Sequence, residues 1–156
     1  GFVNEVHYFA ISVALEGNGT NETFDNRQYS TLIRLLSSLK QKYGIFPWNV
    51  LGLSEICIPP GKSRAPGQHF DWDRLVDAGL TFGAEEVAGA ASDIPQDLRG
   101  LMENWGYCLG GNDTDFTHRL LSFRDRYQRH NSQNPHFCAS SALCALLLRR
   151  AKHSDK

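Results

Sequence analysis

The sequence predicts an α+β fold, in which a buried strand and one amphipathic helix precede a small three-helix bundle. A nearly continuous apolar and β-branched run extends from His7 to Leu15, as is typical of a strand buried on both faces. One amphipathic helical pattern follows it, and three more lie near the end of the chain. We therefore expect a partial sheet domain at residues 1–78, a linker at 79–93 and a helical domain at 94–156.

The first predicted helix runs from Asn26 to Tyr43. Its apolar residues recur at three- and four-residue steps, while its basic residues fall elsewhere. Asp25 or Thr23 is expected to cap the helix, because a short side-chain oxygen accepts hydrogen bonds from the exposed amides of the first turn. Gly44 is expected to end it, since glycine readily adopts the left-handed conformation found at helix C-termini.

The segment between this helix and the bundle is predicted to contain a strand end, a loop and a short helix. We expect a short strand end at Asn49–Leu53, a Pro- and Gly-rich loop at Pro59–Gly67 and a short helix at Trp72–Ala78. The stretch that follows is rich in Gly and Ala and poor in large apolar residues, which favours a linker.

The helical domain contains the three remaining patterns. Pro95 is expected in the first turn of the first helix, and Gly106 is expected to end that helix. Asp113 or Thr114 is expected to cap the second helix. The third helix is expected from about Phe137 to Ala151.

Composition excludes some classes of partner. The formal net charge of −1 gives no long-range field that would attract nucleic acid or an anionic membrane. No run approaches the ~20 consecutive apolar residues that a membrane-spanning helix needs. We therefore expect neither nucleic-acid binding nor a membrane span.

The segment from Trp48 to Trp72 reads WNVLGLSEICIPPGKSRAPGQHFDW. It resembles the signature of zinc-dependent N-acetylmuramoyl-L-alanine amidases of the AmpD/AmiD type, N-V-V-G-H-S-D-I-A-P-G-R-K-x-D-P-G-P-x-F-x-W. The resemblance implies that the predicted sheet is the C-terminal part of an amidase-type mixed sheet. The positions that agree are Asn49, Val50, Gly52, Ser54, Ile56, Pro60, Gly61, Pro66, Gly67, Phe70 and Trp72.

The second half resembles the three-helix peptidoglycan-binding module that follows the catalytic domain in AmiD-type amidases. Gly106 and Tyr107 match the corner after the first helix of that module, and Phe123 matches its second helix. Arg124 stands where the module usually has Gln. The two resemblances together cover the chain from about Ala10 to Lys152.

The residues that carry the family's chemistry are replaced in this chain. Leu53 stands at the position of a zinc-binding His and Ala65 at that of a zinc-binding Asp, and neither side chain can donate a lone pair to a cation. Ala14 stands at the position of the general base, which must hold a proton, and Ser63 at that of an oxyanion-stabilising Lys. The family's first zinc-binding His would lie upstream of Ile11, before this chain begins, so the resemblance implies a degenerate and N-terminally truncated pseudoenzyme with no metal, cofactor or catalytic residue.

Two alternatives would restore part of the lost chemistry, one with Glu16 as the general base and the other with Lys62 and Arg64 as the positive charges that stabilise the oxyanion. Glu16 shares the strand face of Ala14 but lies about 6–7 Å further along. Lys62 and Arg64 flank Ser63 and carry positive charge.

A relocated metal site is a third alternative. His7, Glu55, Cys57 and His69 are metal-capable residue types near the old site in the sequence.

The resemblance implies a structural role. A strand of this kind without sheet neighbours leaves open edges, so either the chain has repacked or another polypeptide covers the edge near Ile11, which we favour. We expect a catalytically inactive, amidase-derived accessory subunit of a larger protein complex, in an organelle of bacterial origin such as the mitochondrion, or in the periplasm or cell envelope.

Two other functions are weighed against this one. In the first alternative, the chain is a peptidoglycan or muropeptide binding module, and a glycan groove is lined by Trp105, Tyr107, Phe116 and Tyr127. In the second, it is an N-acetylmuramoyl-L-alanine amidase completed by another chain.

Overall fold

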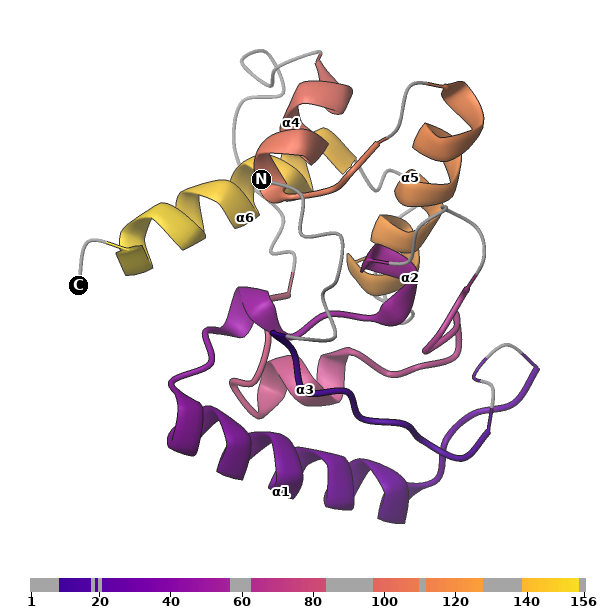
Figure 1. The fold of residues 1–156 in the computed structure, drawn as a ribbon, viewed down its shortest axis with the longest axis vertical. Helices are drawn as coiled ribbons and strands as arrows, with labels where there is room; N and C mark the ends of the chain where they lie inside the picture. The colour runs from indigo at the N-terminus through magenta and orange to yellow at the C-terminus, as the bar shows by residue number, and fades with distance from the viewer. Residues whose placement is uncertain are drawn as a thin grey trace.

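The computed structural model describes residues 9–17, 19, 21–56, 63–83, 97–109, 112–127 and 139–154. These residues form short and medium-length helices joined by irregular segments (Figure 1). In chain order the helices are α1 (Asn26–Tyr43), the 3-10 helix η2 (Pro47–Asn49), α2 (Leu53–Ile56), α3 (Asp73–Asp77), α4 (Leu98–Trp105), α5 (Asp113–Tyr127) and α6 (Ala139–Ser154).

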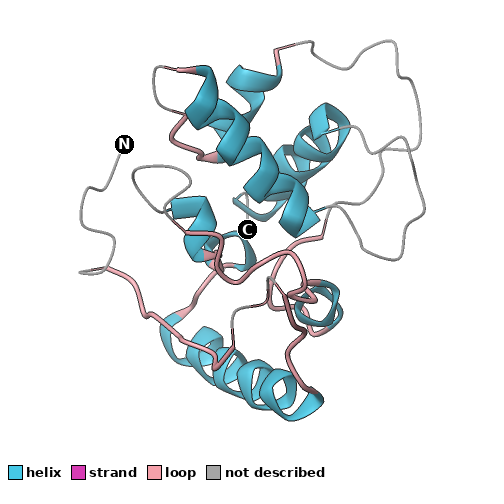
Figure 2. Cartoon of the chain, turned by 90° about the vertical axis from the view of Figure 1, so that its right-hand side faces the viewer, coloured by secondary structure: helices cyan, strands magenta, loops and turns pink. Residues whose placement is uncertain are grey.

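The predicted α+β fold class is wrong for the described part of the chain, which is helical and contains no strand (Figure 2). The described part of the predicted first strand, residues 9–15, is a non-helical segment without a ladder partner. The predicted strand end at Asn49–Leu53 is occupied instead by the end of η2 and the first residue of α2. A strand exists only when a neighbour exchanges backbone hydrogen bonds with it, and no described residue does so here.

Helix α1 has the predicted limits and caps. Asp25 accepts a hydrogen bond from the Gln28 amide, and the Gln28 side chain accepts one from the Asp25 amide, each at 2.8 Å. This reciprocal pair satisfies two amides that the helix itself leaves unpaired. Gly44 follows in the left-handed conformation with φ of 62°, as expected of a helix end.

Helix α1 is fastened along its length to the segment around α3. Arg74 donates to the Asn26 side chain at 2.8 Å near the start of α1. The Tyr29 hydroxyl accepts from the backbone amide of Asp71 at 2.6 Å, and Lys40 donates to the Gly79 carbonyl at 2.6 Å near the other end. These bonds fix the helix against the first of two hydrophobic cores.

The buried apolar residues form two clusters. The first cluster lies between α1, α3 and the segments beside them, and the second lies between α4, α5 and α6. The first contains Phe24, Tyr29, Leu32, Phe70, Trp72, Leu75 and Leu80. The second contains Phe82, Met102, Trp105, Tyr107, Leu109, Phe123, Tyr127, Ala142, Leu143 and Leu146.

The predicted three helices of the second half are confirmed. Helix α4 ends at Gly106, whose φ of 123° few other residues adopt. Asn112, rather than Asp113 or Thr114, caps α5, because its side chain accepts from the Asp115 amide at 2.8 Å. Arg150 of α6 donates to the last carbonyls of α4, at 3.1 and 2.8 Å. Pro95 and Phe137 lie outside the described residues.

Within the described ranges, no helix combines the length and apolar character needed to cross a lipid bilayer.

Candidate functional site

The structure places two of the degenerate positions beside each other. The amide of Ser54 donates to the carbonyl of Ala65 at 2.8 Å, which holds the start of α2 against the loop before α3. Leu53 and Ala65 are therefore neighbours, and both are exposed, Leu53 to 52%. Both side chains are hydrocarbon and offer no ligand to a cation.

Gly52 has a packing reason to be glycine. A Cβ at this position would lie 2.9 Å from Cδ of Pro66 and 3.3 Å from the Trp72 ring. The carbonyl of Gly52 also accepts from the Glu55 amide at 3.0 Å, which closes the turn that begins α2. The backbone frame of the resemblance is thus maintained by close packing.

A second glycine secures the same loop from the N-terminal side. The carbonyl of Gly19 accepts from the His69 amide at 2.8 Å. Gly19 has φ of 56°, and a Cβ there would lie 1.9 Å from the carbonyl oxygen of Pro66. Only glycine permits this approach, since both the conformation and the space exclude a side chain.

Glu55 anchors the site to the helical bundle. Its Oε1 accepts from the Tyr107 hydroxyl at 2.8 Å, and its Oε2 accepts from the Gly52 amide at 2.7 Å and from Arg126 Nη1 at 2.5 Å. The Glu55 and Arg126 side chains are only 4% and 2% exposed. Both carboxylate oxygens are therefore engaged within the protein, which argues against Glu55 as a metal ligand.

The surroundings of Arg126 explain how a buried cation is tolerated. Its guanidinium lies 4.7 Å from the Trp72 ring and 4.8 Å from the Tyr127 ring, and it donates to the Thr81 hydroxyl at 2.6 Å. Burial lowers the pKa of Arg126, but the charge and hydrogen bond of Glu55, together with Tyr127 and Tyr107, more than reverse this, so that the pKa is raised. The pair is a fixed charge couple between the two halves of the molecule.

Burial also raises the pKa values of two tyrosines, Tyr107 and Tyr127. Loss of solvent, followed by the charge of Glu55, raises the pKa of Tyr107 well above its ordinary value. Loss of solvent raises the pKa of Tyr127 as well. Both phenols therefore keep their protons at physiological pH, and Tyr107 donates a hydrogen bond to Glu55.

Two further α5 residues bind the same short helix. Arg119 Nη1 and Ser122 Oγ donate to the Ser54 carbonyl at 2.9 and 3.2 Å. Arg119 Nε also donates to the Cys108 carbonyl at 3.0 Å. Sequence reasoning missed this arrangement, although Arg119, Ser122 and Arg126 share one helical face at three- and four-residue steps.

Of the remaining predicted positions, Ser63 lies beside Ala65, whereas no described contact joins Ala14 to the pair at Leu53 and Ala65. Ala14 is exposed, and no described hydrogen bond connects its segment to Leu53. Ser63 Oγ accepts from the Ala65 amide at 3.1 Å, which makes it a turn residue.

The residues proposed to replace the lost general base and the lost Lys have other bonds or lie outside the described ranges. The Glu16 carbonyl accepts from the Gln28 side chain, and Arg64 pairs with Asp125 at 3.2 Å. Lys62 lies outside the described residues.

Of the four residues proposed for a relocated metal site, the structure describes Glu55 and His69. His7 and Cys57 lie outside the described residues, Glu55 is committed to Arg126, and His69 is exposed. Within the described ranges, no group of three His, Cys, Asp or Glu side chains is arranged to hold a metal ion.

The predicted glycan-binding aromatics belong to the core. Trp105, Tyr107 and Tyr127 are buried in the second cluster. Phe116 packs against that cluster, and the Arg99 guanidinium lies 4.6 Å from its ring. These side chains stabilise the bundle and do not form an open groove.

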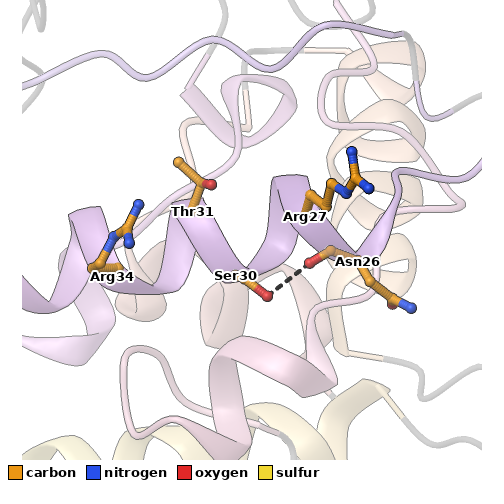
Figure 3. A pocket seen from close by; sticks show the side chains of 5 residues that line it. All are labelled: Asn26, Arg27, Ser30, Thr31 and Arg34. Atoms are coloured by element: carbon orange, nitrogen blue, oxygen red, sulfur yellow. Dashed lines mark hydrogen bonds between the residues drawn. The ribbon is translucent and has the colours of Figure 1, made fainter.

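A surface hollow of about 280 Å³ lies elsewhere, on helix α1 (Figure 3). Asn26, Arg27, Ser30, Thr31 and Arg34 line it. The Ser30 hydroxyl donates to the Asn26 carbonyl at 2.8 Å. The lining includes two cations, Arg27 and Arg34, and no carboxylate or histidine that could act as an acid or base.

Comparison with solved structures identifies the fold. A crystal structure of AmpDh3 from Pseudomonas aeruginosa matches with a TM-score of 0.63 and 22% identity over 83% of this chain. The N-acetylmuramyl-L-alanine amidase AmiD from E. coli, in complex with the substrate anhydro-N-acetylmuramic acid-L-Ala-D-gamma-Glu-L-Lys, matches with a TM-score of 0.62 and 24% identity over 83% of this chain. This chain shares their fold.

The shared fold extends over only part of these proteins. The chain spans about half of their length, 55% of AmpDh3 and 53% of AmiD. No family model matches the sequence, and no curated protein does. The amidase likeness therefore rests on the fold and on the residues of the Trp48–Trp72 signature.

Proposed function

We propose that this protein is a catalytically inactive relative of the amidases that serves as a structural subunit of a larger protein complex. The main support is the pair at Leu53 and Ala65. The Ser54–Ala65 hydrogen bond brings together the two positions that bind zinc in the family the sequence resembles, and both carry hydrocarbon side chains. Such a surface cannot polarise an amide carbonyl or activate water.

A second support is the way the frame around this pair is kept. Gly19 and Gly52 allow close approaches that a larger side chain would block. The Glu55–Arg126 pair ties the frame to the bundle. Packing is therefore maintained where ligands are lost, which fits a scaffold better than an enzyme.

Metal and turnover measurements on the full chain test the loss of activity. The protein is incubated with zinc, dialysed, and assayed for bound metal and for cleavage of a muropeptide between lactyl and L-Ala groups. We expect no stoichiometric zinc and no cleavage. Either stoichiometric zinc with turnover, or turnover without added metal, would contradict the proposal.

A gain-of-ligand variant tests the alignment itself. Leu53→His combined with Ala65→Asp places two zinc ligand types on adjacent backbone segments. We expect zinc to raise the melting temperature of the double variant but not that of either single variant. Equal responses of all three variants would show that the two positions do not face a common site.

The subunit role is tested by the size and composition of the particle in gentle extracts of the native source. We expect the chain to elute with a defined set of proteins in fixed ratio, far above its own size. Elution as a free monomer would contradict the proposal. Retention on purified peptidoglycan at moderate salt would favour a binding module instead.

A further inference from the structure

The segment Phe9–Leu15 is uncovered to an unusual degree. Phe9 is 82% exposed, Ile11 53% and Val13 39%, and the small residues between them are exposed as well. Only Leu15 packs, in part, against the first hydrophobic core. Both faces of the segment are therefore open to a partner.

The main chain of this segment is open too. Among the described residues, no backbone hydrogen bond reaches Phe9–Leu15. The segment contains no charged residue and no proline, which are the residues that usually protect an exposed edge from pairing. Another extended strand can exchange backbone hydrogen bonds with a row of such amides and carbonyls.

The sequence of the segment is complementary to itself. We propose that two copies of this protein pair through Phe9–Leu15 as antiparallel strands, with Ser12 at the two-fold axis. Ile11 then faces Val13 of the second copy, Phe9 faces Leu15, and Ala10 faces Ala14. Every large apolar residue meets a large one on one face of the ribbon, and every small residue meets a small one on the other.

A second copy fits this segment because the register centred on Ser12 keeps the alternation of large and small residues in phase across the ribbon. A two-fold axis through Ser12 repeats each contact of residue i with j as j with i, as a symmetric dimer requires. β-branched cross-strand pairs such as Ile11–Val13 are among the favourable ones. The pairing deepens the proposed structural role, because it names the chain that covers the edge near Ile11.

The body of the protein leaves the segment accessible and fixes its end. Leu15, the last pairing residue, packs in part against the first core, and the Gly19–His69 hydrogen bond holds the chain four residues further on. Seven residues per copy make a small interface, so the dimer is expected to be weak and dependent on protein concentration.

Cysteine crosslinking of the full chain tests the register. Ser12→Cys is oxidised at increasing protein concentration, and disulfide dimers are resolved on nonreducing gels. In the proposed register the two Cα atoms at position 12 are about 4.5–5.5 Å apart, within the range for a disulfide. We expect at least tenfold more dimer than from the natural protein, which controls for its own cysteines.

Ala10→Cys and Ala14→Cys are matched controls, since both positions are exposed and on the same side of the strand as Ser12. Either variant alone places its two cysteines about 13 Å apart, too far to bond. A mixture of the two variants brings position 10 opposite position 14, and we expect the mixed dimer to form. Crosslinking by all three single variants, as in a parallel pairing or random collision, would overturn the register.

Sedimentation of Val13→Lys gives an independent measurement. We expect the natural protein to become heavier with concentration, and Val13→Lys to stay monomeric with an unchanged circular dichroism spectrum, because Val13 belongs to neither buried cluster. A natural protein that remains monomeric at all concentrations and fails to crosslink through position 12 would overturn the proposal. The zinc and turnover results on the same samples stand apart, since they depend on Leu53 and Ala65 and not on pairing.

Discussion

Two apolar segments in the first half of this protein have opposite fates. The described residues of the segment from Gly52 to Trp72, 52–56 and 63–72, are held by the Ser54–Ala65 bond, by close glycine packing and by the buried charge of Glu55. The segment Phe9–Leu15 is at least as apolar, yet it is exposed and unpaired. The difference lies in the availability of partners, because apolar character becomes structure only where something covers it. Substitutions in the two segments should therefore differ sharply.

The largest difference is expected between two phenylalanines. Phe70 is 2% exposed in the first core and Phe9 is 82% exposed. Phe70→Ala leaves a cavity and is expected to lower the free energy of unfolding by about 4 kcal/mol. Phe9→Ala is expected to change it by about 0.5 kcal/mol or less. Urea unfolding at low protein concentration measures both, and equal losses would contradict the comparison.

The next largest effect is expected at the buried ion pair. Arg126→Met leaves Glu55 as an unpaired buried charge and is expected to cost about 3 kcal/mol. Arg64→Met removes an ion pair in which Arg64 is 54% exposed, and it is expected to cost about 1 kcal/mol or less. Adding Glu55→Gln to Arg126→Met should recover part of the loss, because the uncompensated charge is then gone. A similar loss in Arg64→Met and Arg126→Met would exclude burial as the cause.

A pair of glycines gives a smaller and more specific effect. Gly19 and Gly44 share the left-handed conformation, with φ of 56° and 62°, but a Cβ at Gly44 would meet no atom within 4 Å. Gly44→Ala is expected to cost about 1 kcal/mol for the backbone conformation alone. Gly19→Ala adds the clash with Pro66 and is expected to cost about 1–3 kcal/mol more. Thermal unfolding compares the melting temperatures of the two variants. Equal melting temperatures would contradict the predicted clash with Pro66.

The mildest effect is expected from alkaline pH. The pKa of Tyr107 is raised in the folded state by burial and by Glu55, so above pH ~10 the unfolded chain loses this proton first. The free energy of unfolding should therefore be constant near neutral pH and fall as the pH rises above ~10. Tyr107→Phe should reduce that slope by up to about 1.4 kcal/mol per pH unit. An unchanged slope would show that Tyr107 does not titrate on unfolding.

Local signals in the sequence were sufficient for most helices. The Asp25 cap and the Gly44 end of α1 follow from short-range chemistry, and both are present in the structure. The end of α4 at Gly106 was predicted correctly, and the start of α5 was predicted to within two residues, although its cap is Asn112. Helix ends are set within a few residues of chain, so a sequence contains most of what determines them.

Long-range partners were harder to predict. The run at Phe9–Leu15 has the composition of a strand, but composition cannot supply the neighbour that a ladder requires. The amidase signature assigned Leu53 and Ala65 to one group of positions, whereas it gave no indication of the ion pair between Glu55 and Arg126. These two residues are 71 positions apart in the sequence, and nothing local in either one indicates the other.

The Glu55–Arg126 couple also determines how the molecule would respond to a break in its chain. The bonds from α5 to Ser54 and Glu55, and the burial of Phe82 in the second core, join the halves without using the peptide backbone between them. A single proteolytic cut between residues 84 and 96 should therefore yield two fragments that remain associated. Each fragment should then need the other in order to refold.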